Sequence, residues 1–89
     1  MKVEFKKSFA KDLKKRFNER NLLEKIKNII ETVDLTEDIN QIPNLKKLKA
    51  QGDFYRIRTG SYRIGLIIKK NTVTFVRLLH RSEIYRYFP

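Results

Sequence analysis

The chain has 89 residues, enough for one small domain, and 40% of them are hydrophobic, enough for a compact core. It contains no cysteine, so disulfides and thiolate metal sites are excluded. No apolar run reaches the length of a membrane span and no signal-peptide segment opens the chain, so we expect one cytoplasmic domain over residues 1–89. The net charge of +11 points to an anionic partner: nucleic acid, a membrane surface or an acidic protein.

The first residues predict a short strand followed by an amphipathic helix. Polar and apolar residues alternate over residues 2–5, which favours a strand with Val3 and Phe5 facing inward. Apolar residues then recur at a spacing of four among lysines over residues 8–18, which is typical of a helix that buries one face. Ser8 is placed to cap the start of this helix.

A second helix is predicted over residues 22–33, where isoleucine, leucine and valine recur at spacings of three and four. Asn21 and Glu24 have the form of its N-terminal cap. The apolar residues lose this period over residues 34–52, and Pro43 interrupts any helix there. We therefore expect a loop with one helical turn in this segment.

The rest of the chain predicts three strands and a short tail. The strands cover residues 54–59, 62–69 and 72–80, which are rich in β-branched and aromatic residues and are separated by short turns. Strands joined by such turns pair antiparallel. The predicted fold is α+β, in the order β-α-α-β-β-β, with a helical hairpin packed on one face of a small, mainly antiparallel sheet.

Positive charge is concentrated in the part of the chain that forms the predicted sheet. Residues 46–89 hold 11 Lys and Arg against two acids, whereas residues 28–45 hold four acids and no basic residue. Arg56 and Arg58 point to the same face of one predicted strand, and the following turn brings Arg63 close to them. Guanidinium groups bind phosphate well, so this cluster is a candidate phosphate site. The alternative interpretation is that the three arginines only solvate an exposed sheet face.

Three sequence segments, in their order and spacing, carry a resemblance to a known family. They are FKKSFAKDL (residues 5–13), YRIRTGSYRI (residues 55–64) and HRSEIY (residues 80–85). Together with the order of elements, they resemble the RelE/ParE superfamily of toxins from toxin–antitoxin systems over nearly the whole chain. The resemblance implies one of two activities: RelE-like members are ribosome-dependent endoribonucleases that cut mRNA in the decoding site, whereas ParE-like members inhibit DNA gyrase.

The resemblance to the RelE branch also implies which residues act in catalysis. The corresponding positions in this chain are Arg56, Arg58, Arg63, Arg81 and Tyr85. RelE-type sites carry a further arginine six positions before the tyrosine, where this chain has Leu79. We add the neighbouring His80 as a candidate acid or base, because histidine is the side chain that titrates nearest to neutral pH.

The chemistry implied for this branch is attack of an RNA 2′-hydroxyl on the adjacent phosphate, without a metal or another cofactor. Preorganised cations would stabilise the charge that develops on the phosphoryl oxygens. The residues expected to hold the RNA are Lys46, Lys47, Lys49, Arg77 and Arg86. The expected partners are a cognate antitoxin protein, the ribosomal decoding site and mRNA, and we expect neither a membrane nor a small-molecule cofactor.

The leading hypothesis is therefore a toxin that cleaves mRNA on the ribosome and inhibits translation. The alternative is a ParE-like gyrase inhibitor or a catalytically inactive RelE-fold binding protein, and Leu79 favours this alternative. A basic RNA-binding module is a third interpretation. Purely structural interpretations also stay open for His80, as a half-buried framework residue, and for Tyr85, as a tail residue packed on the sheet edge.

Overall fold

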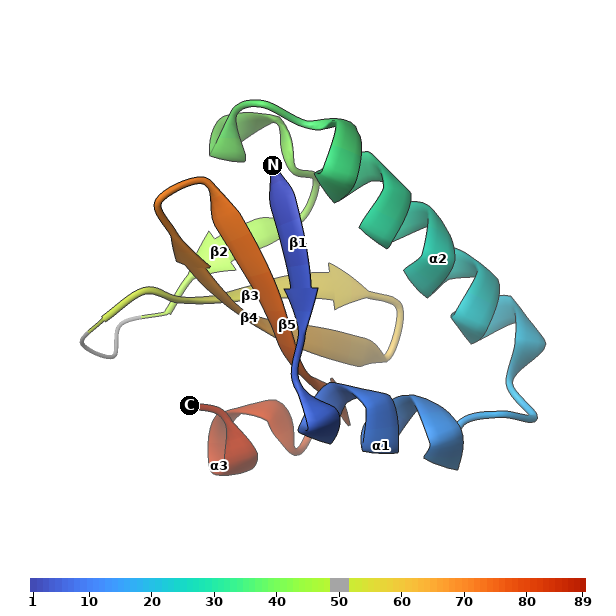
Figure 1. The fold of residues 1–89 in the computed structure, drawn as a ribbon. Helices are drawn as coiled ribbons and strands as arrows, with labels where there is room; N and C mark the ends of the chain where they lie inside the picture. The colour runs from blue at the N-terminus through green and yellow to red at the C-terminus, as the bar shows by residue number, and fades with distance from the viewer. Residues whose placement is uncertain (49–51) are drawn as a thin grey trace.

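The computed structural model describes residues 1–48 and 52–89, which form helices packed on a five-stranded sheet (Figure 1). The elements in chain order are β1 (Lys2–Phe5), α1 (Lys7–Lys15), α2 (Arg20–Leu35), the 3-10 turn η1 (Ile39–Gln41), β2 (Leu45–Lys47), β3 (Phe54–Thr59), β4 (Tyr62–Lys69), β5 (Thr72–His80) and α3 (Ile84–Tyr87). No helix in these residues is long and apolar enough to cross a membrane.

The sheet has the strand order β1-β5-β4-β3-β2. β1 runs parallel to β5, and the other neighbouring pairs are antiparallel, so the predicted α+β class with a mainly antiparallel sheet is confirmed. β3, β4 and β5 begin and end at the predicted residues, because alternating side chains and short turns define them locally. β2 was not predicted, since its three residues are a leucine and two lysines whose strand form depends on pairing with β3.

Both long helices lie where the apolar spacing predicts them, but their ends differ. α1 ends at Lys15 instead of residue 18, and α2 is longer at both ends than predicted. The predicted caps are wrong: Ser8 and Asn21 lie inside the helices, and the residues at the two N-cap positions make no side-chain cap bond. The Ser8 hydroxyl instead donates to the carbonyl oxygen of Val76 in β5, at 2.6 Å.

The main core lies between the two long helices and one face of the sheet. Its most deeply buried side chains are Phe9, Ile26, Val33, Ile57, Ile64, Leu66, Val73, Phe75 and Leu78. β1 contributes less than expected, because Val3 is only half-buried and Phe5 is 53% exposed. Phe5 lies on the predicted inward face, in register with Phe75 and with the two rings 5.4 Å apart, but β1 is an edge strand, so the Phe5 ring covers only the margin of the core.

A second, smaller apolar cluster covers part of the opposite face of the sheet. Leu78 belongs to the main core and Leu79 to this second cluster, as expected for neighbours along a strand. The buried members of the second cluster are Leu48, Leu79, Ile84 and Phe88. The C-terminal helix α3 therefore folds back onto the face that the long helices leave open.

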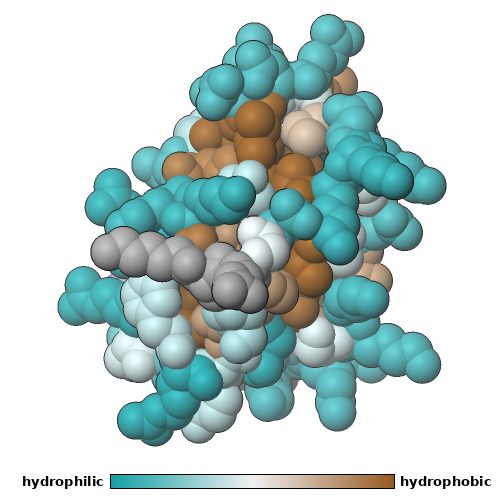
Figure 2. Space-filling model, turned by 90° about the vertical axis from the view of Figure 1, so that its left-hand side faces the viewer, coloured by the Kyte–Doolittle hydropathy of each residue, from teal (hydrophilic) through white to brown (hydrophobic). Residues whose placement is uncertain are grey.

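Two open grooves are lined in part by residues of β3. The first, of about 490 Å³, runs between α2 and the end of β3, with Ile29, Val33 and Ile57 among its lining residues. The second, of about 390 Å³, lies between η1, β2 and β3 and includes Ile39 and Leu45. Figure 2, which looks at the left-hand side of Figure 1, shows apolar surface framed by hydrophilic side chains. The molecule thus presents apolar surface outside its closed core.

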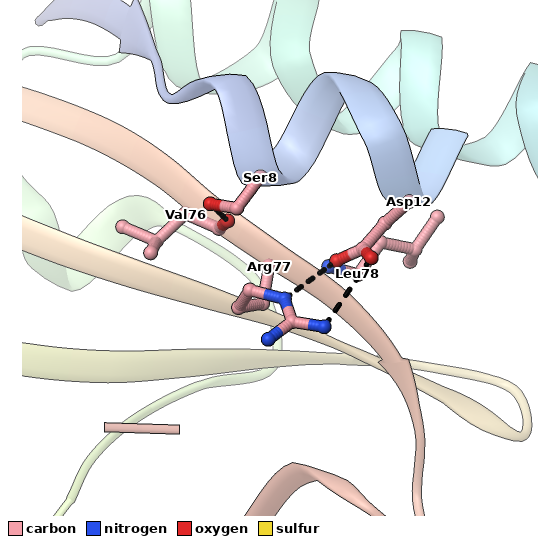
Figure 3. Close-up of polar contacts among 5 residues, drawn as sticks. All are labelled: Ser8, Asp12, Val76, Arg77 and Leu78. Carbon is pink, nitrogen blue, oxygen red and sulfur yellow. Dashed lines mark hydrogen bonds and ion pairs between the residues drawn. The ribbon is translucent and has the colours of Figure 1, made fainter. Parts of the chain in front are cut away.

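Helix α1 lies along the part of the β5 edge that β1 leaves unpaired. The pairing with β1 stops at Phe75, and two side chains of α1 take over from there (Figure 3). The carbonyl of Val76 accepts from the Ser8 hydroxyl, and the Leu78 amide donates to Asp12 Oδ2 at 2.8 Å. α1 therefore supplies the hydrogen-bond partners that another strand would supply, and it protects this edge.

Candidate functional site

Three arginines gather on the face of the sheet that carries α3. Arg58 and Arg63 are direct cross-strand partners in β3 and β4, and Arg56 lies opposite Gly65 in the same pair of strands. Alternation along the strands directs all three side chains away from the main core, which contains the intervening Ile57. Like charges placed directly opposite one another destabilise a sheet, so a bound anion would stabilise this arrangement.

Arg63 lies at the electrostatic centre of this group. Burial lowers the pKa of the Arg63 guanidinium below its ordinary value, and the positive charges of Arg56 and Arg58 lower it further. Arg81 acts in the same direction, whereas Tyr85 acts in the opposite one. The five residues therefore share one electrostatic neighbourhood, although Arg81 and Tyr85 come from the turn after β5 and from α3. A bound phosphate would relieve the mutual repulsion of the cations.

Backbone carbonyl groups hold two of the arginines in place. Arg63 Nη1 donates to the carbonyl oxygens of Gly60 and Tyr62, both at 2.9 Å. Arg56 Nη1 donates to the carbonyl oxygen of Asn44 at 3.0 Å, and its buried Nε has no hydrogen-bond partner in the part of the chain that the structure describes. Within residues 1–48 and 52–89, no carboxylate forms an ion pair with either guanidinium. Their charge thus remains available to a ligand.

The structure does not bring His80 to the arginine cluster. Arg63 is the cross-strand partner of Leu79, whereas His80 is the partner of Tyr62 on the other face of the sheet. The His80 ring stands edge-on to the Tyr62 ring at 5.7 Å, and its Nδ1 lies 2.8 Å from the Ser82 hydroxyl oxygen. The predicted acid–base role of His80 therefore conflicts with its position. The side chain beside Arg63 is that of Leu79, which is buried in the second cluster.

Arg77, predicted to bind RNA, is engaged in an ion pair instead (Figure 3). Its Nε lies 2.8 Å and its Nη2 3.3 Å from the two carboxylate oxygens of Asp12. Asp12 is 5% exposed and also accepts from the Leu78 amide. The ion pair gives Arg77 a structural role, and its predicted RNA-binding role stays a prediction. Sequence analysis overlooked Asp12, although an acid among the apolar positions of an amphipathic helix signals a buried partner.

The other predicted RNA-binding residues have different positions. Lys46 and Lys47 are exposed on the edge strand β2, and Lys46 pairs across the strands with Arg56. Arg86 is exposed on α3, whereas Lys49 lies outside the described residues. Alternation puts Lys46 on the face of the arginine cluster, whereas Lys47 pairs with Tyr55 and lies on the opposite face, with its Nζ 5.9 Å from the centre of the Tyr55 ring. Lys46 therefore extends the positive surface of the arginine cluster, and Lys47 does not.

A polar group on the helix-covered face was not predicted. The Tyr62 hydroxyl donates to Glu19 Oε1 at 3.1 Å, and the Arg16 guanidinium lies 5.1 Å from the centre of the Tyr62 ring. Burial raises the pKa of Tyr62 above its ordinary value of 10.0, and the hydrogen bond to Glu19 raises it further. This group joins the end of α1 to β4, so its role is structural.

The amino-acid sequence and the fold both match known proteins. Residues 3–85 match the family described as the ParE toxin of the type II toxin–antitoxin system parDE. The chain is 43% identical, over 90 residues that cover 100% of both proteins, to "Toxin RelE3" of Methanocaldococcus jannaschii.

Two solved structures show the same fold. One is a chain of the RelB–RelE antitoxin–toxin complex from Methanococcus jannaschii, with a TM-score of 0.73, 41% identity, and coverage of 98% of this chain and 100% of that one. The other is YafQ from E. coli strain BL21(DE3), with a TM-score of 0.75, 13% identity, and coverage of 93% of this chain and 96% of that one. The resemblance inferred from the sequence motifs is confirmed, and the chain belongs to the RelE/ParE superfamily of type II toxin–antitoxin toxins.

Proposed function

We propose that this toxin is an endoribonuclease that cuts mRNA on the ribosome, in the cytoplasm, and thereby inhibits translation. The observation that carries the proposal is the partly buried Arg63, with Arg58 directly opposite it and Arg56 on the same face of β3, where the charges of Arg81 and Tyr85 also act on Arg63. Such a group of cations, which has no carboxylate partner within residues 1–48 and 52–89, suits a phosphodiester. The 43% identity to a protein named RelE supports the same branch of the superfamily.

The proposed reaction uses the RNA itself as nucleophile. The 2′-hydroxyl loses its proton, its oxygen attacks the adjacent phosphorus, and the bond to the 5′-oxygen of the next nucleotide breaks. The leaving oxygen takes up a proton, so the products are a 2′,3′-cyclic phosphate and a 5′-hydroxyl. Negative charge builds up on the phosphoryl oxygens in the transition state, where Arg56, Arg58 and Arg63 would stabilise it. This reaction proceeds without a metal ion.

Proton transfer falls to a group other than these arginines, because a guanidinium remains protonated throughout the neutral range. Tyr85 is the titratable side chain in the neighbourhood of Arg63, and it is 66% exposed on α3. We assign it the transfer of a proton to or from the RNA. His80 is set aside for this role because the sheet separates it from Arg63.

Binding of RNA and ribosome would rest on the basic surface around this site. Lys46, beside Arg56, and Arg86 on α3 are exposed and able to contact the RNA backbone, and Lys47, on the opposite face of β2, could do so only where the RNA passes around this edge of the sheet. The net charge of +11 would accelerate approach to ribosomal RNA. Contacts of this kind release counterions, so binding should weaken steeply as salt is added.

A cognate antitoxin is the second proposed partner. The match to the toxin chain of a RelB–RelE complex supports it. An acidic antitoxin segment would complement the arginine cluster, and an apolar segment would complement the groove between α2 and β3 on the other side of the sheet, where Ile29, Val33 and Ile57 are among the lining residues. Cover of the arginine cluster by the acidic segment would restrain the toxin.

The experiment is induced expression followed by mapping of mRNA 5′ ends. We expect cuts in phase with codons in translated messages, and we expect these cuts to vanish when translation is blocked. Arg63→Ala should reduce cleavage about 10²–10³-fold, as for the loss of one preorganised donor. Arg20→Ala removes the same charge from an exposed position of α2 and should cut like the wild type. Intact mRNA under wild-type expression would refute the proposal.

Inhibition of DNA gyrase is the second candidate function. Two observations favour it: the match to the ParE toxin family, and the buried Leu79 beside Arg63, where RelE-type sites carry an arginine. In this case purified toxin should block supercoiling of plasmid DNA by gyrase, and induced cells should show a DNA-damage response with intact mRNA. Normal supercoiling in the presence of excess toxin would exclude this candidate.

A further inference from the structure

Gly65 in the middle of β4 is a glycine whose backbone conformation does not require one. Gly52 and Gly60 have φ values of +100° and +59°, which favour glycine, whereas no such value applies to Gly65. A methyl group at Gly65 would instead lie 2.8 to 2.9 Å from the Cγ, Cδ1 and Cδ2 atoms of the Phe88 ring. The absence of a side chain at this position therefore makes room for Phe88.

The Phe88 ring is held closely on this glycine. It is 3% exposed and stands edge-on to the Phe54 ring, with centroids 5.6 Å apart at 87°. Leu48, Leu79 and Ile84 are the other buried members of this cluster. The Phe88 amide donates to the carbonyl oxygen of Ile84 at 2.9 Å, so the anchored ring and the last turn of α3 form one unit.

Helix α3 depends on this anchor for its order. It has four residues, and isolated helices of that length are not stable in water. Tyr85 and Tyr87 are 66% and 51% exposed and add little burial, whereas Ile84 is fully buried. The side chains that hold α3 on the sheet are therefore Ile84 at its start and Phe88 directly after its end.

We propose that the contact between Phe88 and Gly65 positions Tyr85 beside Arg63. Gly65 lies two residues after Arg63 on the same face of β4, and Phe88 lies three residues after Tyr85, so one contact sets the distance between the strand and the helix. Phe88 and Gly65 are positioning residues in this scheme, since neither touches the RNA. The inference rests on the proposed role of Tyr85 in cleavage.

The test compares Gly65→Ala, Phe88→Ala and the double variant with the wild-type toxin on mRNA-programmed ribosomes. Each single variant should lower the cleavage rate at saturating ribosome about 100-fold, the effect of a small displacement in an active site. The affinity for the programmed ribosome should change little, because the arginines stay on their strands. In the Phe88→Ala background, Gly65→Ala should cause no further loss, since the ring with which its methyl group collides is gone.

Nuclear magnetic resonance supplies a readout that does not depend on activity. The Phe88 ring should shield an α proton of Gly65, and this upfield shift should disappear in Phe88→Ala, together with the helical signals of Tyr85 and Arg86. Phe17→Ala removes a phenylalanine that is 69% exposed and should leave spectrum and cleavage unchanged. If Gly65→Ala fails to fold, Phe88→Ala near the chain end still tests the contact.

The outcomes separate this inference from the proposed function. Unchanged Tyr85 signals or wild-type cleavage in Phe88→Ala would overturn the positioning role. Equal and additive losses from the two substitutions would overturn it as well, because independent defects add. If the wild-type toxin does not cleave mRNA and Phe88→Ala still loses the helical signals of Tyr85, the anchor is supported and the nuclease proposal is refuted.

Discussion

Replacing Asp12 by alanine should destabilise the protein markedly, because one carboxylate joins α1 to the open edge of β5. Its oxygens accept from Arg77 Nε, Arg77 Nη2 and the Leu78 amide, at 2.8, 3.3 and 2.8 Å. Without this acceptor the buried Leu78 N–H has no hydrogen-bond partner, which lowers the free energy of unfolding by about 1–3 kcal/mol. The Arg77 side chain is 27% exposed, so water can hydrate its guanidinium and offset part of the lost ion pair. We expect a loss of about 3 kcal/mol in the free energy of unfolding.

Urea unfolding followed by circular dichroism measures this loss. Asp12→Asn keeps an acceptor for the Leu78 amide but loses the charge, so it should cost about half as much, nearer 1.5 kcal/mol. Asp34→Ala, which removes an exposed acid from the end of α2, should stay within about 0.5 kcal/mol of the wild type. An Asp12→Ala variant as stable as Asp34→Ala would refute the argument that α1 seals the β5 edge through this carboxylate.

Three further predictions follow from the electrostatics. The raised pKa of Tyr62 means that folding favours its neutral form, so wild-type stability should fall as the pH rises through and above the ordinary value of 10.0. Tyr62→Phe should lack this component, and equal pH dependence of the two proteins in urea unfolding would contradict the assignment. Leu79→Arg buries a cation beside Arg63 and should therefore lower the unfolding free energy by about 3 kcal/mol. Urea unfolding measures this loss, and an unchanged midpoint would show that the position tolerates a charge. Lys46→Ala should reduce the slope of log affinity for RNA against log salt by about one, and an unchanged slope in filter binding would remove Lys46 from the interface.

The strands of the sheet and the grouping of the three arginines were predictable because their signals are local. Alternation places Arg56 and Arg58 on one side of β3, and the short turn before β4 brings Arg63 opposite Arg58. β2 escaped prediction because a three-residue strand takes its form from its neighbour rather than from its own side chains. The incorrect helix caps have a related cause, since the Ser8 hydroxyl bonds to β5 instead of to its own helix.

Composition and local sequence motifs were enough to predict the superfamily, the α+β class, the strong positive charge and the arginine cluster. Which cations are paired and which distant side chains meet depends on the tertiary packing. Arg77 is paired because α1 brings Asp12 to it from 65 residues away. Leu79 lies beside Arg63 and His80 does not, because the pairing of β4 with β5 sets the face of each. The contact of Phe88 with Gly65 depends on the chain folding back on itself, which no local pattern specifies.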